Sequence, residues 1–393
     1  MSKQIINNGD SSSVVTNKIN GNFSELQNGV TTLASNSAYW VTKFDYFNTQ
    51  NRDATRTNFG LTLSDTYKWF GGVLSSNGNI YGIPHSSTDI LIIDPYSNTA
   101  TKTTFGLTLS DAGKWGGGIL GLNGKIYGIP ASSTDILIID PISNTATRST
   151  MGLTLPATNK WFGGVLSNNG KIYSIPFDVS SILIIDTVSN SATTTTFGLT
   201  LTDISKWIGG VLGTNGKIYA FPDNAADILI IDPLSNSATR TSLGLTSMSS
   251  IDKWAGGALG TNGKIYGMPL SDTSILVIDP INNSATRTAF GLTLTGTLKW
   301  YGGSLATNGK IYGIPHNASS ILVVDPINST ATTTNFGTDL SLTEKYFGSN
   351  VSINEKIYAF PADSSDILII DDDFDATEKT SLDRCVSAYY NKF

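Results

Sequence analysis

The sequence predicts an all-β fold, a seven-bladed β-propeller of four-stranded blades with a short N-terminal helical arm. The prediction rests on a 46-residue unit that recurs in seven near-copies, and on four strand-like segments within each copy. One tyrosine marks the copies at steps of 46 residues, with a single step of 47, at Tyr81, Tyr127, Tyr173, Tyr219, Tyr266, Tyr312 and Tyr358. A repeat of roughly 40 to 50 residues built from short strands is typical of propellers.

The first copy illustrates the four strands, which we expect at residues 69–74, 80–84, 89–94 and 99–104. The first strand carries glycines, as expected where blades crowd around a common axis. The second follows Asn77-Gly78, a pair that favours the positive φ angles of a hairpin turn. The third contains an unbroken apolar run at 90–93, so both of its faces should be buried between stacked blades. The fourth follows an aspartate turn and is rich in threonine, which suits an outer edge.

The pattern of the fourth strand occurs eight times, whereas that of the third strand occurs seven times. The surplus copy begins at Ala54, before the first repeat, and the last copy begins at Ala376. A ring left open would expose unpaired strand edges. We therefore expect residues 54–59 to pair with the third strand of the last blade, residues 366–371, and to close the ring.

We expect three regions: an N-terminal arm at residues 1–36, the propeller at 37–381 and a C-terminal tail at 382–393. Only 14% of the residues are charged and the net charge is −6, which argues against a nucleic-acid-binding surface. Cys385 is the single cysteine, so no intrachain disulfide is expected. Residues 1–30 contain no long apolar run, and we expect neither an ordinary signal peptide nor a membrane span there.

The repeat resembles the surface-layer type of propeller repeat, which is known for a Tyr-Val-Thr-Asn motif. In the second copy the resemblance is carried by Gly-Lys-Ile-Tyr at 124–127, a small polar loop at 132–134, Ile-Ile-Asp at 138–140 and Ser-Asn-Thr at 143–145. It extends over residues 54–380, with departures at the Gly-Ile-Pro after the tyrosine and at a Lys-Trp pair in the first strand. The resemblance implies the fold, but such propellers serve many unrelated roles.

The N-terminal arm carries a heptad-like apolar seam. Its members follow one another at steps of 4, 3, 4 and 3 residues: Ile19, Phe23, Leu26, Val30 and Leu33. A helix this short, and interrupted by Gly29, is marginal in water unless a partner covers its apolar side. Two interpretations remain open: the helix packs on its own propeller, or it anchors the chain to other chains and makes a homo-oligomer.

The same arm resembles the N-terminal attachment segment of tailed-phage fibre and appendage proteins. The resemblance is carried by Ile-Ile-Asn-Asn-Gly at 5–9 and by residues 16–26, with Lys-Ile-Asn at 18–20 followed by Asn-Phe at 22–23 and Glu-Leu at 25–26. It implies a virion component that is made in the host cytoplasm. It also implies that the arm binds other virion proteins while the propeller projects outward.

Candidate catalytic residues are sparse. A glycan hydrolase would usually need two carboxyl groups in different environments, but the prominent aspartates recur once per blade, which favours a role in turns. Glu344, Glu355 and Glu378 are three of only four glutamates and fall in the last copy, where the repeat also departs from its pattern. This clustering would favour an enzyme, although drift in the closing blade is the simpler explanation. We assign no catalytic residue.

We assign no cofactor and no metal site either. The acidic run at 371–375 resembles the start of a calcium loop, but Ala376 and Leu382 stand where such a loop needs glycine and glutamate. His85 and His316 follow the Ile-Pro segments of the first and sixth copies without further ligands. We therefore expect both histidines to be surface loop residues.

A Lys-Trp pair begins the first strand of six copies, and Lys345-Tyr346 replaces it in the seventh. One interpretation is packing between blades, because a large side chain at a fixed repeat position usually belongs to the core. The other is an exposed ring of aromatic platforms and cations that binds sugars or an acidic glycan. In that case the binding residues are Lys68, Trp69, Lys114, Trp115, Lys160, Trp161, Lys206, Trp207, Lys253, Trp254, Lys299 and Trp300.

These observations lead to the hypothesis of a bacteriophage virion appendage, fibre-like on a tail or head, whose propeller binds a host receptor or glycan. A glycan-acting propeller enzyme and a purely architectural virion protein are the alternatives. We expect no nucleic-acid partner.

Overall fold

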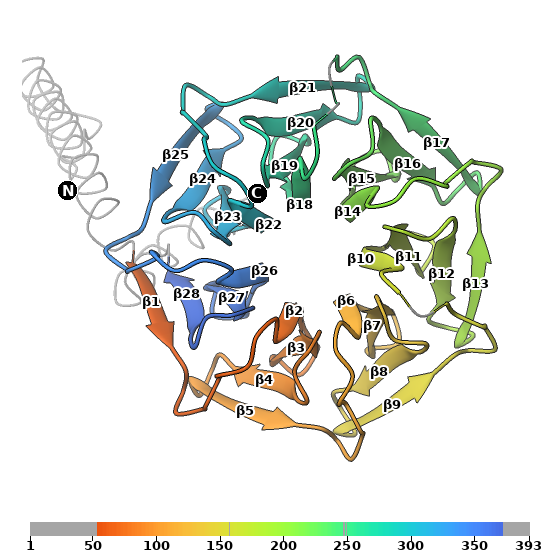
Figure 1. Cartoon of the computed structure of the whole chain (residues 1–393), viewed down its shortest axis with the longest axis vertical. Helices are drawn as coiled ribbons and strands as arrows, with labels where there is room; N and C mark the ends of the chain where they lie inside the picture. Colours follow the sequence, from red (N-terminus) through yellow and green to blue (C-terminus); the bar gives the residue numbers. More distant parts are fainter. Residues whose placement is uncertain (1–52, 157, 247, 249, 372–393) are drawn as a thin grey trace, which may run out of the picture. The chain divides into compact units, whose positions relative to one another are not determined.

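The computed structural model describes residues 53–371, apart from residues 157, 247 and 249. This part of the chain is a seven-bladed β-propeller: seven antiparallel four-stranded sheets are arranged in a ring (Figure 1). The predicted all-β propeller of four-stranded blades is therefore confirmed. The arm at residues 1–36, the domain boundaries near 37 and 381, and the tail at 382–393 lie outside the described residues.

Each blade runs from an innermost first strand to an outermost fourth strand. Blade 1 comprises β2 (Trp69–Leu74), β3 (Ile80–Pro84), β4 (Ile90–Asp94) and β5 (Thr99–Thr103). Blades 2, 3 and 4 comprise β6 (Trp115–Leu120), β7 (Ile126–Pro130), β8 (Ile136–Asp140), β9 (Thr145–Ser149); β10 (Trp161–Leu166), β11 (Lys171–Pro176), β12 (Ile182–Asp186), β13 (Ser191–Thr195); and β14 (Trp207–Leu212), β15 (Ile218–Pro222), β16 (Ile228–Asp232), β17 (Ser237–Thr241). Blades 5, 6 and 7 comprise β18 (Trp254–Leu259), β19 (Ile265–Pro269), β20 (Ile275–Asp279), β21 (Ser284–Thr288); β22 (Trp300–Leu305), β23 (Ile311–Pro315), β24 (Ile321–Asp325), β25 (Thr330–Thr334); and β26 (Tyr346–Val351), β27 (Ile357–Pro361), β28 (Ile367–Asp371), β1 (Asp53–Thr57).

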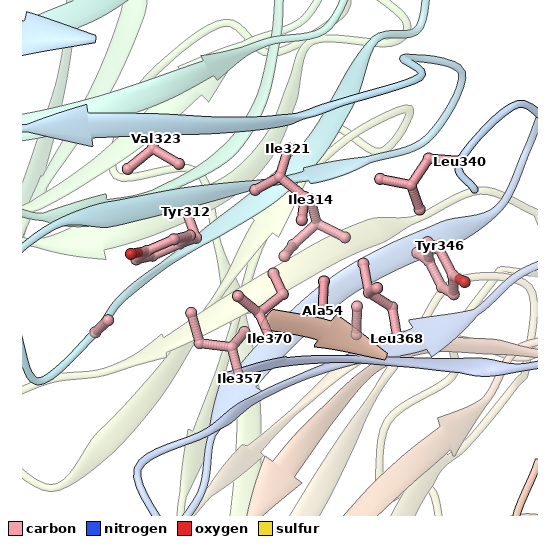
Figure 2. Packing of buried hydrophobic residues seen from close by; sticks show 12 residues of the cluster. Ala54, Tyr312, Ile314, Ile321, Val323, Leu340, Tyr346, Ile357, Leu368 and Ile370 are labelled. Atoms are coloured by element: carbon pink, nitrogen blue, oxygen red, sulfur yellow. The ribbon is translucent and has the colours of Figure 1, made fainter. Parts of the chain in front are cut away.

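The ring closes through the N-terminal strand, as predicted. β1 pairs antiparallel with β28, in a register that runs from Asp53 opposite Asp371 to Thr57 opposite Ile367. Ala54 is only 3% exposed and joins the apolar cluster between blades 6 and 7 (Figure 2). The competing C-terminal copy at 376–379 lies outside the described residues, and the edge of β28 is occupied by β1.

The third strands bury both faces, as their apolar runs predict, so the core lies between blades.

Hydrogen bonds at the hairpin end also join neighbouring blades. Asn77 Nδ2 donates to the Tyr81 hydroxyl at 3.0 Å and to the Pro141 carbonyl of the next blade at 3.2 Å. The contact recurs around the ring, and Asn354 Nδ2 donates to the Pro95 carbonyl at 3.0 Å across the junction between blades 7 and 1.

Glycines allow the seven first strands to meet near the axis. The pairing of β2 with β3 shifts register between Trp69 and Gly72, so residues 70 and 71 form a bulge in which Gly71 has φ +71°. Equivalent glycines of neighbouring blades almost touch. A Cβ on Gly163, for example, would lie 2.9 Å from the Gly209 Cα, closer than carbon atoms can pack.

Removal of β1 should open the ring. Deleting residues 1–60 leaves the edge of β28 unpaired and uncovers the cluster around Ala54, so the melting temperature should fall by roughly 5 to 15 °C. A chain lacking only residues 1–52 retains β1 and is the matched control. Equal melting temperatures for the two truncated chains, measured by calorimetry, would contradict the role of β1 in closure.

Contact between glycines at the axis predicts a second, position-specific effect. Gly163 and Gly198 share a φ of +79°, but a Cβ on Gly198 would have no atom within 4 Å. Both alanine variants incur the cost of left-handed backbone, whereas Gly163→Ala also overpacks the ring. Urea unfolding should therefore show Gly163→Ala to be roughly 1 to 3 kcal/mol less stable than Gly198→Ala, and a smaller cost for Gly163→Ala would refute the crowding argument.

Candidate functional site

The six Lys-Trp pairs lie in the core. Both side chains of every pair are at most 3% exposed, and Lys345 and Tyr346 of blade 7 are buried in the same way. Trp115 Nε1 donates to the Asp135 carbonyl at 3.0 Å, and the other tryptophans make the same bond in their own blades. An exposed ring of platforms would need these rings at the surface, so the structure favours packing between blades over that hypothesis.

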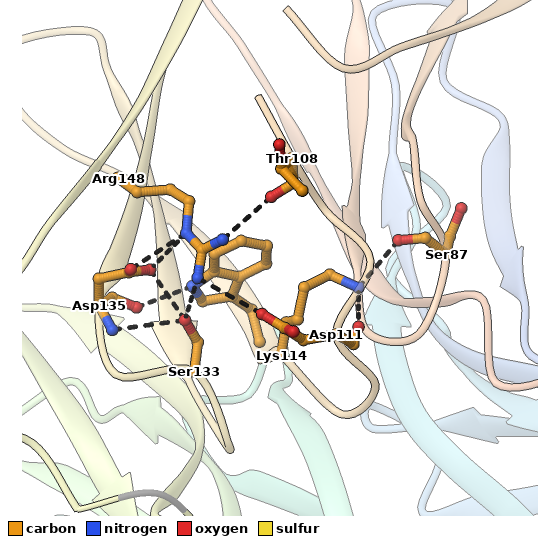
Figure 3. Close-up of polar contacts among 8 residues, drawn as sticks. Ser87, Thr108, Asp111, Lys114, Ser133, Asp135 and Arg148 are labelled. Carbon is orange, nitrogen blue, oxygen red and sulfur yellow. Dashed lines mark hydrogen bonds and ion pairs between the residues drawn. The ribbon is translucent and has the colours of Figure 1, made fainter. Parts of the chain in front are cut away.

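Four of the buried lysines join loops of neighbouring blades: Lys68, Lys114, Lys299 and Lys345. Lys206 and Lys253 donate to carbonyls of their own loops, and within the described part of the chain Lys160 Nζ has no hydrogen-bond partner. The Lys114 ammonium donates to the carbonyl of Asp111 in its own loop and, at 3.0 Å, to that of Ser87 in the preceding blade (Figure 3). Burial lowers the pKa of Lys114 to about 8. The neutral carbonyl cage satisfies the ammonium hydrogens, which explains how a cation occupies a buried position without a carboxylate in direct contact.

An arginine covers the same region of the blade. Arg148 of β9 donates through Nε to the Asp135 carboxylate at 2.9 Å and through Nη1 to the Thr108 carbonyl at 3.0 Å (Figure 3). Its guanidinium carbon lies 5.5 Å from the centre of the Trp115 ring. We call this space, bounded by the tryptophan, the second-to-third-strand loop and the fourth strand of one blade, the arginine slot.

The aspartates and glutamates considered as catalytic candidates either stabilise turns or lie far from one another. Asp94 Oδ1 accepts hydrogen bonds from the backbone N–H groups of Tyr96 and Ser97 at 2.9 and 3.1 Å, and this confirms the predicted turn role. Glu344 precedes the six-residue strand β26 and Glu355 follows it. Such a strand is roughly 20 Å long, so the two glutamates do not form a catalytic pair. Glu378 and the anchoring residues Ile19, Phe23, Leu26, Val30 and Leu33 lie outside the described residues.

The axis of the ring contains a narrow cavity with aromatic side chains beside it. The cavity has a volume of about 180 Å³ and is lined chiefly by first-strand glycines. The second residues of five first strands line it: Phe70, Gly116, Ile208, Tyr301 and Phe347. Four of the seven second residues are aromatic, and the fourth aromatic one is Phe162. Phe70 packs against Phe162, Tyr301 and Phe347, with ring centres 5.3, 5.3 and 4.8 Å away. We call these four side chains the axial aromatic cluster.

The residues that follow the prolines of the second strands surround this cluster. His316 stacks on Phe347 with ring centres 4.8 Å apart, and His85 lies 5.5 Å from Phe70. His316 is 4% exposed and His85 is half-buried, so the expectation of two surface histidines was wrong for His316. Their Nδ1 atoms lie 3.2 and 3.0 Å from the carbonyls of Tyr346 and Trp115. Burial lowers the pKa of His316 to about 4, which leaves a neutral imidazole near pH 7.

Asp223 occupies the equivalent position in blade 4. It is 2% exposed, and within the described part of the chain its Oδ1 has no hydrogen-bond partner. Burial, and then the charge of Asp252, raise the pKa of Asp223 to about 7. Burial and the field of Asp223 also raise the pKa of Tyr301. The axial end therefore combines aromatic faces with one carboxyl group that titrates near neutral pH.

The axial aromatic cluster and Asp223 were not predicted from the sequence, because the predictions relied on positions at which the copies carry the same residue. At the second position of the first strand the seven copies carry Phe70, Gly116, Phe162, Ile208, Ala255, Tyr301 and Phe347. After the second-strand proline they carry His85, Ala131, Phe177, Asp223, Leu270, His316 and Ala362. Comparing the copies for differences would have singled out both positions, and the fold brings the two sets together around the axis.

Among the described residues, no group of three or more His, Cys, Asp or Glu side chains is arranged to hold a metal ion. That part of the chain also has no helix long and apolar enough to cross a membrane.

No protein-family model matches the sequence, and comparison with curated protein sequences finds no match. Solved structures share the fold at low identity. Virginiamycin B lyase from Staphylococcus aureus is 14% identical, with a TM-score of 0.64 over 81% of this chain and 99% of the lyase. An auxiliary nutrient binding protein from Bacteroides ovatus is 13% identical, with a TM-score of 0.51 over 82% and 76%. Hydrazine synthase from Kuenenia stuttgartiensis is 12% identical, with a TM-score of 0.56 over 80% and 99%. Because enzymes and a binding protein share this fold, these similarities establish the propeller and leave the function to be argued from the site.

Proposed function

We propose that the chain is an appendage protein of a tailed-phage particle, whose propeller binds a component of the host surface at the axial aromatic cluster. One observation carries the binding role: the copies share most of the residues that build the blades, whereas two positions whose side chains lie close together near the axis differ from copy to copy. Differences that converge at one place on a rigid scaffold are typical of a recognition site, because such a site needs few and particular groups.

The chemistry of the axial end suits recognition. Phe70, Phe162 and Tyr301 remain partly exposed, and rigid aromatic faces provide contact area at little entropic cost. The carboxyl group of Asp223 lies nearby but is 2% exposed, so the aromatic faces would make the first contact with a ligand. The cavity of about 180 Å³ is smaller than a site for a whole oligosaccharide, so the ligand would enter by one end group.

The virion role is supported by the N-terminal resemblance to phage attachment segments. The seam of Ile19, Phe23, Leu26, Val30 and Leu33 would anchor the chain to other virion proteins or to further copies of itself. The surface-layer type of repeat is compatible with this display role, since it forms a rigid propeller. In this proposal the protein is localised to the virion.

A second candidate function is a glycan-acting enzyme, and Asp223 is the observation that favours it. A carboxyl group with a pKa raised to about 7 is a suitable general acid, and the charge of Asp252 contributes to that shift. The two functions differ in one measurement. Turnover of a host polysaccharide that Asp223→Asn abolishes would favour the enzyme, whereas binding without turnover favours the appendage.

Incorporation into particles should depend on the apolar seam. Replacing Phe23 and Leu26 with Asp places charge where the seam must be buried, so the variant should be missing from purified particles while its propeller remains folded. Ser24→Asp with Gln27→Asp adds the same charge beside the seam and is the control. Mass spectrometry of particles released by the producing cells would test this, and normal incorporation of the seam variant would contradict the anchoring role.

Adsorption should depend on the axial aromatic cluster. Purified propeller should compete with particles for host cells, and Tyr301→Ala should weaken that competition by roughly tenfold because stacking contact is lost. Tyr96→Ala removes a tyrosine that is 91% exposed in a hairpin turn and is the control. Competition by Tyr301→Ala at the wild-type level would exclude this site. Failure of the wild-type protein to compete would favour a purely architectural role.

A further inference from the structure

Five blades fill the arginine slot with a cation from their outermost strand. The guanidinium carbons of Arg148, Arg240 and Arg287 lie 5.5, 5.1 and 5.6 Å from the tryptophan ring centres of their blades. Arg56 in blade 7 and Lys102 in blade 1 take the equivalent place and donate to the carbonyls of Asp339 and Thr62 at 2.9 and 3.2 Å. The slot is therefore a regular feature of the repeat, and it is normally occupied.

Blades 3 and 6 lack the cation and its acidic partners. Thr194 and Thr333 stand where the other blades carry Arg or Lys, and Ser181 and Ser320 stand at the position of Asp135. A second acidic position, Asp111 in blade 2, is Ala157 and Gly296 in these copies. Blade 5 also carries serines at both acidic positions, Ser274 and Ser250, but keeps its cation, because Arg287 donates to the Asp272 carboxylate at 2.7 Å instead. Loss of the cation itself therefore distinguishes blades 3 and 6 from the other five.

The replacements leave two matching pockets. The pocket in blade 3 has a volume of about 430 Å³ and that in blade 6 about 410 Å³, and both are within the range of ligand sites. Equivalent residues line them, including Trp161 and Trp300 at the base and Thr194 and Thr333 at the rim. The two threonines are exposed on β13 and β25, which lie on the outside of the ring (Figure 1). These pockets are therefore distinct from the axial aromatic cluster.

The lining of the blade 6 pocket favours a neutral ligand with many hydroxyl groups. The blade 3 pocket has the same hydroxyl-bearing lining and one carboxylate, that of Asp178, which already accepts a hydrogen bond from the Ser205 N–H at 2.7 Å. The blade 6 pocket presents the polar groups of Asn317, Ser319, Ser320 and Thr333 and contains no carboxylate. Its one cation, Lys299, already donates to the carbonyls of Leu270, Asp272 and Gly296 at 3.1, 3.0 and 2.9 Å. A charged ligand would therefore find no free counter-charge there, and its desolvation would be uncompensated.

Backbone carbonyls supply further acceptors. In blades 2 and 4 the carbonyls of Thr108 and Thr200 accept hydrogen bonds from the arginines at 3.0 and 2.8 Å. The equivalent residues, Thr154 and Thr293, line the two pockets, and these blades carry no arginine in the fourth strand to donate to their carbonyls. A hydroxyl group of a ligand could take the place of the missing N–H donor, while leucine side chains of the lining contact the apolar face of a sugar ring.

We propose that each vacant arginine slot binds one neutral sugar residue, so that the propeller holds a glycan at two peripheral points. This inference rests on the proposed host-surface binding only for its choice of glycan, and it adds two sites to the axial one. Trp161 and Trp300 are 1% and 3% exposed, so they form the floor of each pocket and the hydroxyl and carbonyl groups provide the specificity. Two weak sites on one rigid body strengthen attachment through multivalency.

The test refills the slots with the residues of blade 2. Ser181→Asp with Thr194→Arg, and Ser320→Asp with Thr333→Arg, recreate the Asp135–Arg148 pair and should preserve the fold. Thr193→Arg with Thr332→Arg adds cations to the opposite face of the same strands and is the control. Saturation-transfer NMR with glucose, galactose, mannose and N-acetylglucosamine should detect binding of at least one sugar to the wild-type protein. The doubly refilled variant should lose this slot binding, because neither slot remains open, whereas the control variant should keep it.

The reverse experiment opens a third slot. Arg148→Thr with Asp135→Ser and Asp111→Ala should add one bound sugar per chain to those that the wild-type protein binds. Binding that is unchanged by refilling, absence of binding by all four sugars, or binding of only charged probes such as arginine amide and sialic acid would overturn the inference. Particle incorporation and adsorption test the proposed function separately. If the refilled variant no longer binds sugar but is still incorporated and still adsorbs, the appendage role is retained and the slots are not the sites that adsorption uses.

Discussion

Closure of the ring by the pairing of β1 with β28 is the constraint on which the rest of the structure depends. Each blade buries its apolar faces only against two neighbours, so blades 1 and 7 would each lose one neighbour in an open chain. Five residues that come first in the described part of the chain complete the last blade and remove that edge. The interblade clusters, the buried lysines and the glycine contacts near the axis all presuppose a closed circle.

The space available to side chains differs between the axis and the outside of the ring. Near the axis there is room for little besides glycine, and four blades each add one aromatic side chain to the axial aromatic cluster. At the outside the fourth strands have free space, and there a cation folds back over its own blade or is absent. The two candidate binding regions therefore arise from the two places where the repeat is least constrained by its neighbours.

The fold was predictable from the sequence because a fixed period, an unbroken apolar third strand and an unequal count of strands each express a geometric requirement. The burial of the lysines was not predictable from the sequence. An isolated Lys114 is expected at the surface, and only the carbonyls of Asp111 and Ser87, brought together from two blades, make its burial tolerable. The arginine slots were likewise hidden, since the partners Asp135 and Arg148 are recognisable as a pair only once β9 is folded beside the loop that holds Asp135. The anchoring seam remains a prediction.

The position of β1 in the chain has a mechanical consequence. A force applied to any residue before Asp53 enters the propeller through β1, and the five register pairs with β28 are the first connections to bear it. Beyond them, Asn354 holds the hairpin end of blade 7 to the Pro95 carbonyl of blade 1, and Lys68 holds the loop end to the Ala362 carbonyl at 2.7 Å. If the arm tethers the protein under tension, the force would thus act on the closure of the ring and not on the junctions between the other blades. The mechanical strength of the short β1–β28 pair would then limit the force that the propeller withstands before it unfolds.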